Sequence, residues 1–369
     1  MLKIEPRKNR SNFLEVSAPV IAVILTMIFG GFLFLSMGKN PFEAIKLIFW
    51  DPIMSPTFSE YSRPQLVIKA APLILIALGL SFGFRANIWN IGAEGQYIMG
   101  ALFSGSIGLA LYPLDAWFIF PLMILGGIIG GIFWAMIPAI LKIKFNTNEI
   151  LVSLMLVYVA EQILALASIG FLRNPEGLGF PGSRDLSKYP SASNPELIVN
   201  SGIHMGVIFS CIAVVFLTYF LTYHRLGFQI KLIGQAPKAA KFSGVNVNYI
   251  VIFCLGLSGG LAGIAGMFEL TGPAGLINID FNVGYGFTAI IVAFLGRLHP
   301  IGILFAGLLM SLTYVGGELA QFMLSIPAAA IQVFQGMLLF FLLSTDLLVS
   351  YKVSFNLGIN NSNPKSKSE

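Results

Sequence analysis

Two segments of the chain set polar side chains in apolar surroundings, and they hold the residues that could do chemistry. The first, residues 81–105 (SFGFRANIWNIGAEGQYIMGALFSG), interrupts an apolar stretch with an arginine, a glutamate and several amides. Ionisable and amide groups at membrane depth are costly, so they normally face a cavity, a partner helix or a solute route. A short cytoplasmic turn between two helices is the alternative. The motif Asn90-Ile91-Gly92 is typical of a helix broken within the membrane.

A similar pattern returns at residues 277–296 (INIDFNVGYGFTAIIVAFLG), where Asn282-Val283-Gly284 echoes the first motif. The topology predicted below puts the first copy on the cytoplasmic side and the second on the external side. Opposite placement is what an inverted repeat produces, and transporters built this way bind their substrate near the repeat interface. We therefore expect a solute pathway between the copies, with chance resemblance of two short motifs as the alternative.

Acidic and aromatic residues add candidates to this pathway. Glu161 and Gln162 lie midway through a predicted span, where polar groups usually serve a function. Solvation at helix ends explains Glu149, Glu269 and Glu318. Aromatic rings near the two motifs, Phe281 among them, could stack on a planar ligand or form the interfacial belt. The predicted pathway residues are Trp89, Asn90, Glu94, Gln96, Asn148, Glu149, Glu161, Gln162, Asn282, Tyr285 and Phe287.

The sequence contains no recognisable motif for ATP hydrolysis, catalysis or metal binding. The nearest match to a Walker A loop, Gly38-Lys39-Asn40, lacks the upstream glycine and the hydroxyl residue. The three histidines form no HExxH pair, no GxSxG group accompanies them, and the two cysteines lie inside apolar runs. We expect this chain to be no enzyme and to bind no metal or cofactor of its own.

Composition predicts the elements that position these residues. Of 369 residues, 56% are hydrophobic and 11% are charged, against about 25% charged in an average soluble domain. Runs of roughly 20 apolar residues recur, and helices satisfy their own backbone hydrogen bonds in lipid. The expected fold is an all-α polytopic membrane protein with about ten transmembrane helices. These spans are Ser17–Met37, Leu66–Phe84, Gln96–Leu111, Trp117–Leu141, Ile150–Ile169, Ile203–Tyr223, Tyr249–Leu270, Val283–Gly296, Ile301–Leu319 and Ala328–Leu348.

Basic residues predict the orientation, because they favour cytoplasmic loops. With the N-terminus inside, 15 of the 22 Lys and Arg residues fall on the cytoplasmic side of an inner membrane. They lie in short loops rather than on one face, which argues against nucleic-acid binding. The predicted domains are cytoplasmic termini at 1–16 and 349–369 and a transmembrane domain at 17–348. External loops run over 38–65 and 170–202, the second being a docking surface or a plain connection.

Paired small residues recur within the predicted spans. One set lies at 126–131 and another at 259–266, with glycines spaced three and four residues apart. At this spacing they line one stripe of a helix and let neighbouring backbones approach closely. We favour packing over phosphate binding, because these glycines lie inside apolar helices rather than after a strand.

The cytoplasmic loop 224–248 (HRLGFQIKLIGQAPKAAKFSGVNVN) predicts a short surface helix. Pro237 suits a first helical turn and Gly244 suits a helix end, which frames a helix over 238–243. Its two lysines and exposed Phe242 indicate a docking site for a partner. An ordinary charged loop would explain neither the paired alanines nor the exposed aromatic ring.

The chain resembles the permease subunits of ATP-binding-cassette importers for nucleosides and simple sugars, in the branch that includes branched-chain amino-acid permeases. The resemblance covers most of residues 66–348 and excludes the first sixty residues and the tail. The form NIGAEGQ is most similar to the nucleoside-type permeases. The segments that carry it are 87–101 (NIWNIGAEGQYIMGA), 146–160 (NTNEILVSLMLVYVA), 225–247 (RLGFQIKLIGQAPKAAKFSGVNV), the glycine-rich stretch 256–266 and 284–302 (GYGFTAIIVAFLGRLHPIG).

The resemblance implies a coupling helix that fits a cleft on a separate ATPase subunit, which alone uses ATP. It also implies a second, related permease subunit in a heterodimer and an extracytoplasmic substrate-binding protein. The family usually has Gly-Glu-Asn-Pro before the alanines, whereas this chain has Gly234-Gln235-Ala236-Pro237, which puts some polar contacts in doubt. The implied coupling residues are Arg225, Gly234, Pro237, Lys238, Ala239, Ala240, Lys241 and Gly244.

The expected function is therefore translocation of nucleosides by alternating access, driven by the ATPase subunit. One alternative is a ribose-like sugar carried by the same machine. A second is a secondary transporter driven by protons or sodium, which needs acidic groups in a relay. A membrane-anchored structural protein is the third, and the polar segments within spans argue against it.

Overall fold

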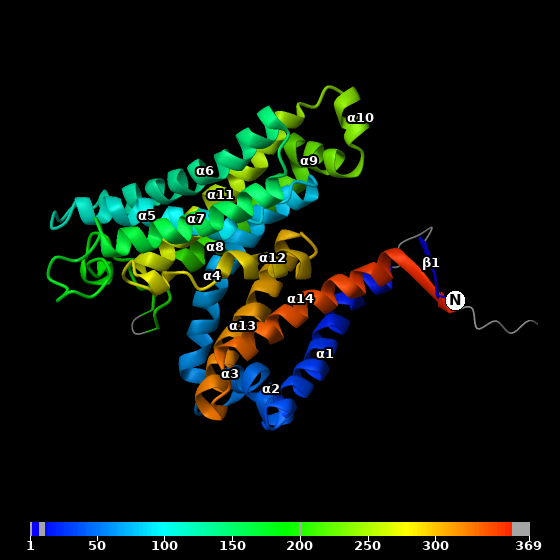
Figure 1. Ribbon diagram of the computed structural model, residues 1–369, viewed down its shortest axis with the longest axis horizontal. Helices are drawn as coiled ribbons and strands as arrows, with labels where there is room; N and C mark the ends of the chain where they lie inside the picture. Colours follow the sequence, from blue (N-terminus) through cyan, green and yellow to red (C-terminus); the bar gives the residue numbers. More distant parts are fainter. Residues whose placement is uncertain (1, 7–11, 199–200, 356–369) are drawn as a thin grey trace, which may run out of the picture. The chain divides into compact units, whose positions relative to one another are not determined.

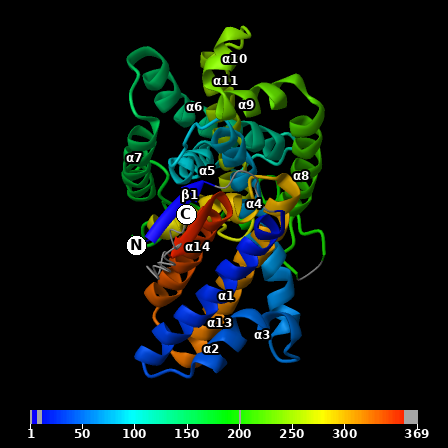
Figure 2. The ribbon, with the colours of Figure 1, turned by 90° about the vertical axis from the view of Figure 1, so that its right-hand side faces the viewer.

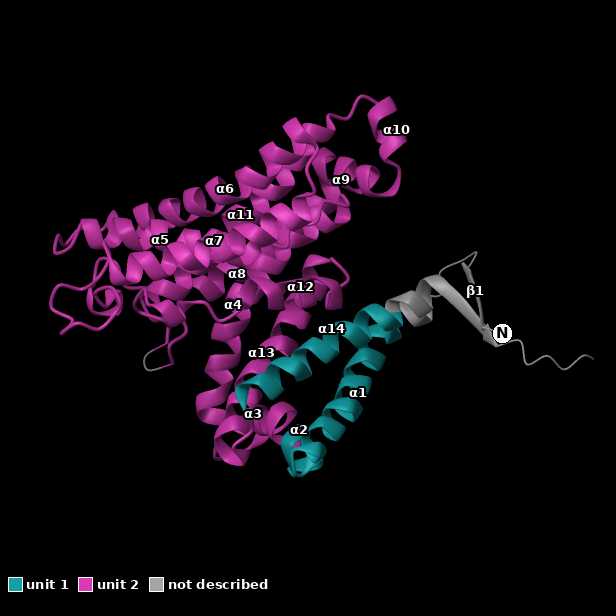
Figure 3. Cartoon of the chain, viewed as in Figure 1, with its two compact units in different colours: residues 1–44, 327–369 teal, residues 45–326 magenta. Residues whose placement is uncertain are grey.

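The computed structural model describes residues 2–6, 12–198 and 201–355 of the chain. It divides into two compact units, residues 1–44 with 327–369 and residues 45–326 (Figure 3). Helix α2 (Pro41–Phe49) crosses the boundary between them in the sequence.

The first unit is a pair of helices, α1 (Asn12–Ser36) and α14 (Ala328–Ser350). The Phe34 and Phe334 rings stack at 5.8 Å between centroids, and the Thr345 hydroxyl donates to the Ala18 carbonyl at 3.2 Å. Strand β1 (Leu2–Pro6) pairs antiparallel with β2 (Tyr351–Phe355), with Leu2 opposite Phe355. Segments from the two ends of the sequence therefore form one unit.

The second unit is a helical bundle, in which α11 packs against α4, α5 and α6 (Figures 1 and 2). Residues 70–84 of α4 are buried throughout, as a helix that is apolar all round requires. The elements of this unit are α3 (Asp51–Met54), α4 (Ser59–Arg85), α5 (Ala93–Ala110), α6 (Ile119–Phe145), α7 (Glu149–Ile169), η1 (Leu186–Lys188), α8 (Met205–Tyr223), α9 (Arg225–Gln235), α10 (Pro237–Phe242), α11 (Val247–Thr271), η2 (Ile279–Phe281), α12 (Tyr285–Leu295) and α13 (Pro300–Leu324).

The all-α polytopic fold is confirmed, and a helix lies at each of the ten predicted spans. Eight helices of the described residues are long and apolar enough to cross a membrane. The other two predicted spans correspond to α5, with 18 residues, and α12, with 11 residues. At 1.5 Å per residue, α12 reaches only about half of the hydrocarbon thickness. These two helices are the ones that follow the broken-helix motifs.

The loop that contains α10 and the loop 170–198 emerge at opposite ends of the bundle. Figure 1 shows α10 at one end and the green segment 170–198 at the other. The segment 38–65, which the sequence predicts to be external, is largely helical and contains α2, α3 and the first turns of α4. The Arg63 guanidinium, on α4, donates twice to the Ile53 carbonyl, at 2.7 and 3.0 Å, and so fixes the end of α3.

The glycine stripes bring three helix backbones into contact, as the sequence predicted. A Cβ atom added at Gly263 of α11 would lie 2.1 Å from the Gly127 carbonyl oxygen of α6. One added at Gly131 would lie 2.0 Å from the Gly259 oxygen, and one at Gly100 of α5 would lie 2.2 Å from the Gly263 Cα. Only glycine allows these approaches, because the opposing atoms are backbone.

We expect Gly263→Ala to destabilise the bundle by at least about 2 kcal/mol, since overpacking costs about 1–3 kcal/mol even where side chains can move. Gly260→Ala is the matched control one turn away, where a Cβ would meet only side-chain atoms, two of Ile132 at 3.4 and 3.5 Å and one of Ile128 at 3.8 Å. The measurement is the thermal unfolding midpoint in detergent. Equal midpoints for the two variants would contradict the close backbone contact.

Candidate functional site

The first broken-helix motif is a turn held by a buried amide network. Helix α4 ends at Arg85 and α5 begins at Ala93. The Asn90 Nδ2 group donates to the Gln96 Oε1 at 2.9 Å and to the Ser258 hydroxyl at 3.0 Å. The Asn90 Oδ1 accepts from the Gly92 amide at 3.0 Å and from the Gln96 Nε2 at 3.1 Å. Both amides are 1% exposed, so they stabilise the turn from within. Their place on a solute pathway stays a prediction.

The second motif ends in a backbone turn that opens a half-length helix. Gly284 has a φ of +82°, in the left-handed region that favours glycine, and α12 starts at the next residue. The Asn282 Oδ1 accepts from the Gly284 amide at 3.3 Å. The Asn282 Nδ2 donates to the Glu161 Oε1 at 2.8 Å, which ties this turn to α7.

The Glu94 carboxylate joins the two motifs. Its Oε1 accepts from the Gly284 amide at 3.1 Å, and its Oε2 accepts from the amides of Gly286 and Phe287, the latter at 3.3 Å. The side chain is 0% exposed. Because α12 begins here, the carboxylate also lies at the positive end of a helix dipole. A Cβ at Gly286 would lie 2.3 Å from the Glu94 nitrogen, so the starts of α5 and α12 are in direct contact. The prediction that the two motifs lie on opposite sides of the membrane is therefore wrong, because the two helix starts meet at one place.

Aromatic rings surround this junction. The Tyr97 ring stacks on Phe281 at 5.4 Å and meets Tyr285 edge-on at 6.1 Å. Tyr314 of α13 lies 5.7 Å from Tyr285, and its hydroxyl is 2.8 Å from that of Thr288. The Tyr97 hydroxyl is buried and has no hydrogen-bond partner among the described residues. A buried hydroxyl without a partner is costly, so the cluster has unused capacity for a polar ligand atom.

A group of charges lies beside the tyrosines. Lys69 of α4 forms an ion pair with Glu318 of α13, and Glu269 of α11 lies within electrostatic range of Lys69 and Tyr285. The explanation of Glu318 by helix-end solvation is therefore incomplete, since a basic side chain from another helix partners it. Such groups within spans commonly mark solute or ion routes. We call Glu94, Tyr97, Tyr285, Tyr314, Thr288, Lys69, Glu269 and Glu318 the central cluster.

Other predicted pathway residues form a separate group near the first turn. The Trp89 ring stacks on Phe294 at 5.7 Å and lies tilted against Phe84 at 5.0 Å between centroids. Its amide donates to the Glu149 Oε1 at 3.4 Å, and Lys142 pairs with the same carboxylate. Solvation at a helix end is therefore an incomplete explanation of Glu149 as well.

Three predicted pathway residues have little or no contact with the central cluster through their side chains. Asn148 caps α7 by accepting from the Ile150 amide at 3.0 Å. Gln162 is exposed on α7, and the Phe287 side chain is 38% exposed, although its amide binds Glu94.

Sequence reasoning missed Tyr97, Tyr314, Thr288 and Lys69. Tyr97 follows Glu94 by three residues and so shares its helix face, a signal that was available. Lys69 and Tyr314 lie in separate helices with no motif around them. Only the packing of α4 and α13 brings them together.

The predicted surface helix forms α10, with Pro237 at its first turn and Gly244, at a φ of +80°, just beyond its end. The Phe242 side chain is 97% exposed, whereas Ala240 is fully buried and anchors the helix. A Cβ at Gly234 would lie 1.9 Å from the Arg85 carbonyl oxygen, so α9 rests directly on the end of α4. The Arg85 Nε in turn donates to the Leu298 carbonyl at 2.9 Å, in the turn after α12.

Comparison with known families gives a match over most of the chain. The family described as branched-chain amino acid transport system / permease component matches residues 62–343. No solved structure matches the chain significantly.

Curated relatives cover nearly the same length. A glucose ABC transporter permease protein of Haloferax volcanii is 31% identical, over 95% of this chain and 93% of its own. A nucleoside ABC transporter permease protein of Lactococcus lactis is 28% identical, over 82% and 84%. A guanosine ABC transporter permease protein of Bacillus subtilis is 25% identical, over 92% and 95%.

Proposed function

The chain belongs to the permease-component family of the branched-chain amino acid transport system and is the membrane-spanning subunit of an ATP-binding-cassette importer; we propose that it carries nucleosides. It is a multi-pass protein of the inner membrane, and such permeases work with an ATPase and a substrate-binding partner. We further propose a heterodimer with a second, related permease subunit.

The observation that carries the nucleoside proposal is the central cluster. Three tyrosine rings and Phe281 pack against one another in this structure, and in the proposed substrate-bound state they would separate to hold a planar base, with the Tyr97 hydroxyl bonding a base or ribose oxygen. Two of the relatives named above are described as nucleoside or guanosine permeases, which supports the same class. The proposed pathway runs past the junction of α5 and α12, where Glu94 holds both helix starts.

The proposed energy input enters through α10. ATP binding closes the ATPase subunits and moves α10, and contact of Gly234 with Arg85 passes this motion to the end of α4. The bond from Arg85 to Leu298 then links α4 to the turn after α12. A rigid chain of contacts thus connects the coupling segment to the helix that Glu94 anchors. Alternating access requires only that the two states bind the solute differently.

A simple sugar is the second candidate, because the Haloferax volcanii relative is described as a glucose permease at 31% identity. Sugars use hydroxyl bonding to acidic and amide groups, which the central cluster also offers through Glu94 and Glu269. A secondary transporter ranks below both, since the family works with an ATPase.

Uptake by the assembled importer in proteoliposomes tests the proposal. Labelled guanosine should enter only with internal ATP, and unlabelled adenosine should compete whereas ribose and glucose should not. Uptake competed by ribose or glucose alone would replace the nucleoside with a sugar. Uptake that is lost when an ionophore is added and does not depend on ATP would contradict coupling to an ATPase subunit. The variant Tyr97→Phe should weaken guanosine uptake about tenfold, as loss of one buried ligand hydrogen bond predicts.

A further inference from the structure

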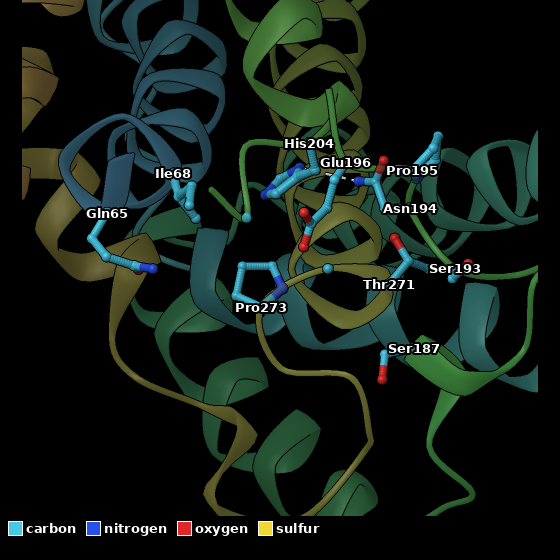
Figure 4. Close-up of a pocket in the computed structure, with 12 residues that line it drawn as sticks. Gln65, Ile68, Ser187, Ser193, Asn194, Pro195, Glu196, His204, Thr271 and Pro273 are labelled. Carbon is cyan, nitrogen blue, oxygen red and sulfur yellow. Dashed lines mark hydrogen bonds between the residues drawn. The ribbon is translucent and has the colours of Figure 1, made fainter. Parts of the chain in front are cut away.

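A cavity of about 480 Å³ opens at the end of the bundle opposite α10, between the starts of α4 and α8 and the end of α11. Its volume falls in the range of about 300–1,000 Å³ that is usual for small-molecule sites. Figure 4 shows His204 and Glu196 on its wall, with Ile68 and Pro273 beside them. The predicted topology places this cavity on the external face, and its wall residues Ile68 and Thr271 are one and two residues along the chain from Lys69 and Glu269 of the central cluster.

Hydrogen bonds fix the tautomer of His204, which caps the start of α8. Its Nδ1 atom accepts from the Gly206 amide at 3.1 Å, and the Asn194 Nδ2 group lies 3.0 Å from the same atom. The Asn194 Oδ1 accepts from the Met205 amide at 3.2 Å, which fixes the direction of the Asn194 amide. With two donors facing Nδ1, the ring hydrogen must be on Nε2.

The Nε2–H group of His204 has no acceptor among the described residues, although the side chain is only 3% exposed. It lies close to Gly272 on the cavity wall, 3.4 Å from where a Cβ of that residue would be. Because Nδ1 accepts hydrogen bonds and carries no proton, the ring is neutral. An unpartnered buried donor at a cavity points to a ligand that supplies an oxygen acceptor.

The rest of the wall sets the charge of that ligand. Ser187, Ser193 and Gln65 add uncharged polar groups, and Ile68 and Pro273 add apolar surface. Glu196 is the one carboxylate on this wall among the described residues, and the wall has no Lys or Arg side chain. A negative wall disfavours phosphates and carboxylates, whereas hydroxyl groups can bond both Nε2–H and the carboxylate.

We propose that this cavity is an outer binding site for the neutral, hydroxyl-bearing solute on its way from the external face to the central cluster. The assignment rests on the proposed function for the identity of the solute, a nucleoside. In this site His204 donates to a ligand oxygen. Glu196 accepts from a ligand hydroxyl and repels the phosphorylated form of the solute. Ile68 and Pro273 pack against a ring of the nucleoside.

Nitrogen-15 NMR of the full-length chain labelled at histidine tests this site without transport. The chain has three histidines, and the His204 signal is assigned by its loss in His204→Gln. Guanosine should move the His204 Nε2 signal in a saturable way and leave those of His224 and His299 unchanged. Guanosine monophosphate should bind at least about tenfold more weakly, a difference of about 1.4 kcal/mol. In Glu196→Gln, which keeps the His204 bonds, this difference should shrink to about threefold or less.

Three results would overturn the site. No shift with guanosine or ribose at about 10 mM, well above a usual KM, would mean that water alone fills the cavity. Equal shifts with guanosine and its monophosphate would remove the role of Glu196. A shift of the His204 signal that appears only when the substrate-binding partner is added, and does not depend on the solute, would mean that the cavity is a contact for that protein. Uptake competed by ribose, together with a ribose-dependent shift, would keep the site and replace only the nucleoside.

Discussion

Glu94→Gln is expected to reduce uptake strongly, because the side chain joins the two broken helices. The carboxylate accepts from three backbone amides, of Gly284, Gly286 and Phe287. The amide of glutamine keeps one oxygen but turns an NH2 group toward at least one of these donors. Each buried donor left without an acceptor costs about 1–3 kcal/mol. A loss of about 2 kcal/mol at the start of α12 alone lowers the equilibrium ratio of the native to the disrupted junction roughly thirtyfold.

Uptake and thermal unfolding of the assembled importer measure this effect. Uptake should fall at least about thirtyfold, in line with the free energy, and the unfolding midpoint should drop. Glu60→Gln is the matched control, since this acid is exposed in the first turn of α4. Both readouts should be unchanged in the control. Normal uptake in Glu94→Gln would mean that the junction of α5 and α12 is not on the transport route.

The fold was largely predictable from hydropathy alone. Apolar runs of span length force helices in lipid, and the structure has a helix at each predicted span. The glycine spacings at 126–131 and 259–266 predicted close packing, which α6 and α11 confirm. The pairing of α1 with α14 was not predicted. Both are apolar helices without a distinctive stripe, so their sequences do not specify a partner.

The site was predictable only where one segment carries the signal. The echo between Asn90-Ile91-Gly92 and Asn282-Val283-Gly284 drew attention to two helix starts, and the structure brings these together through Glu94. The motif could not separate side chains that hold the turn, such as Asn90, from side chains that face the junction. That distinction depends on Ser258 and Gln96 satisfying Asn90 completely.

Charges on different helices were the least predictable part. Glu318 looked like a solvated helix end because its partner, Lys69, lies 249 residues away in the chain. Trp89 looked like a stacking platform for a ligand, yet Phe84 and Phe294 already cover it. The periodicity of a sequence predicts which face of a helix is polar. It does not predict which side chains of a neighbouring helix contact that face.

Phe242→Ala is expected to uncouple transport from ATP while leaving the permease folded. The ring is 97% exposed on α10, so the folded chain gains almost nothing from it. An exposed aromatic ring of this kind is typical of an interface hot spot, whose removal costs about 2 kcal/mol or more. Affinity for the ATPase subunit should then fall roughly thirtyfold.

The affinity is measured by titrating the ATPase subunit onto the permease in nanodiscs, with ATP-driven uptake measured in parallel. Phe180→Ala is the matched control, because Phe180 is 77% exposed in the loop at the opposite end of the bundle. Its affinity for the ATPase should be normal. Unchanged affinity in Phe242→Ala would assign the coupling contact to other groups. The lysines Lys238 and Lys241 flank the ring and would be reversed in charge next.

The contacts behind α10 explain why a surface ring should matter to a distant site. Gly234 lies against the Arg85 carbonyl, and Arg85 bonds Leu298 beyond α12. A docked ATPase subunit moves these backbones together only if it binds α10 tightly, and Phe242 is the largest side chain on α10. Loss of the ring should therefore lower uptake and leave solute binding at the junction of α5 and α12 intact. A parallel loss of solute binding would mean that Phe242 acts on the fold rather than on coupling.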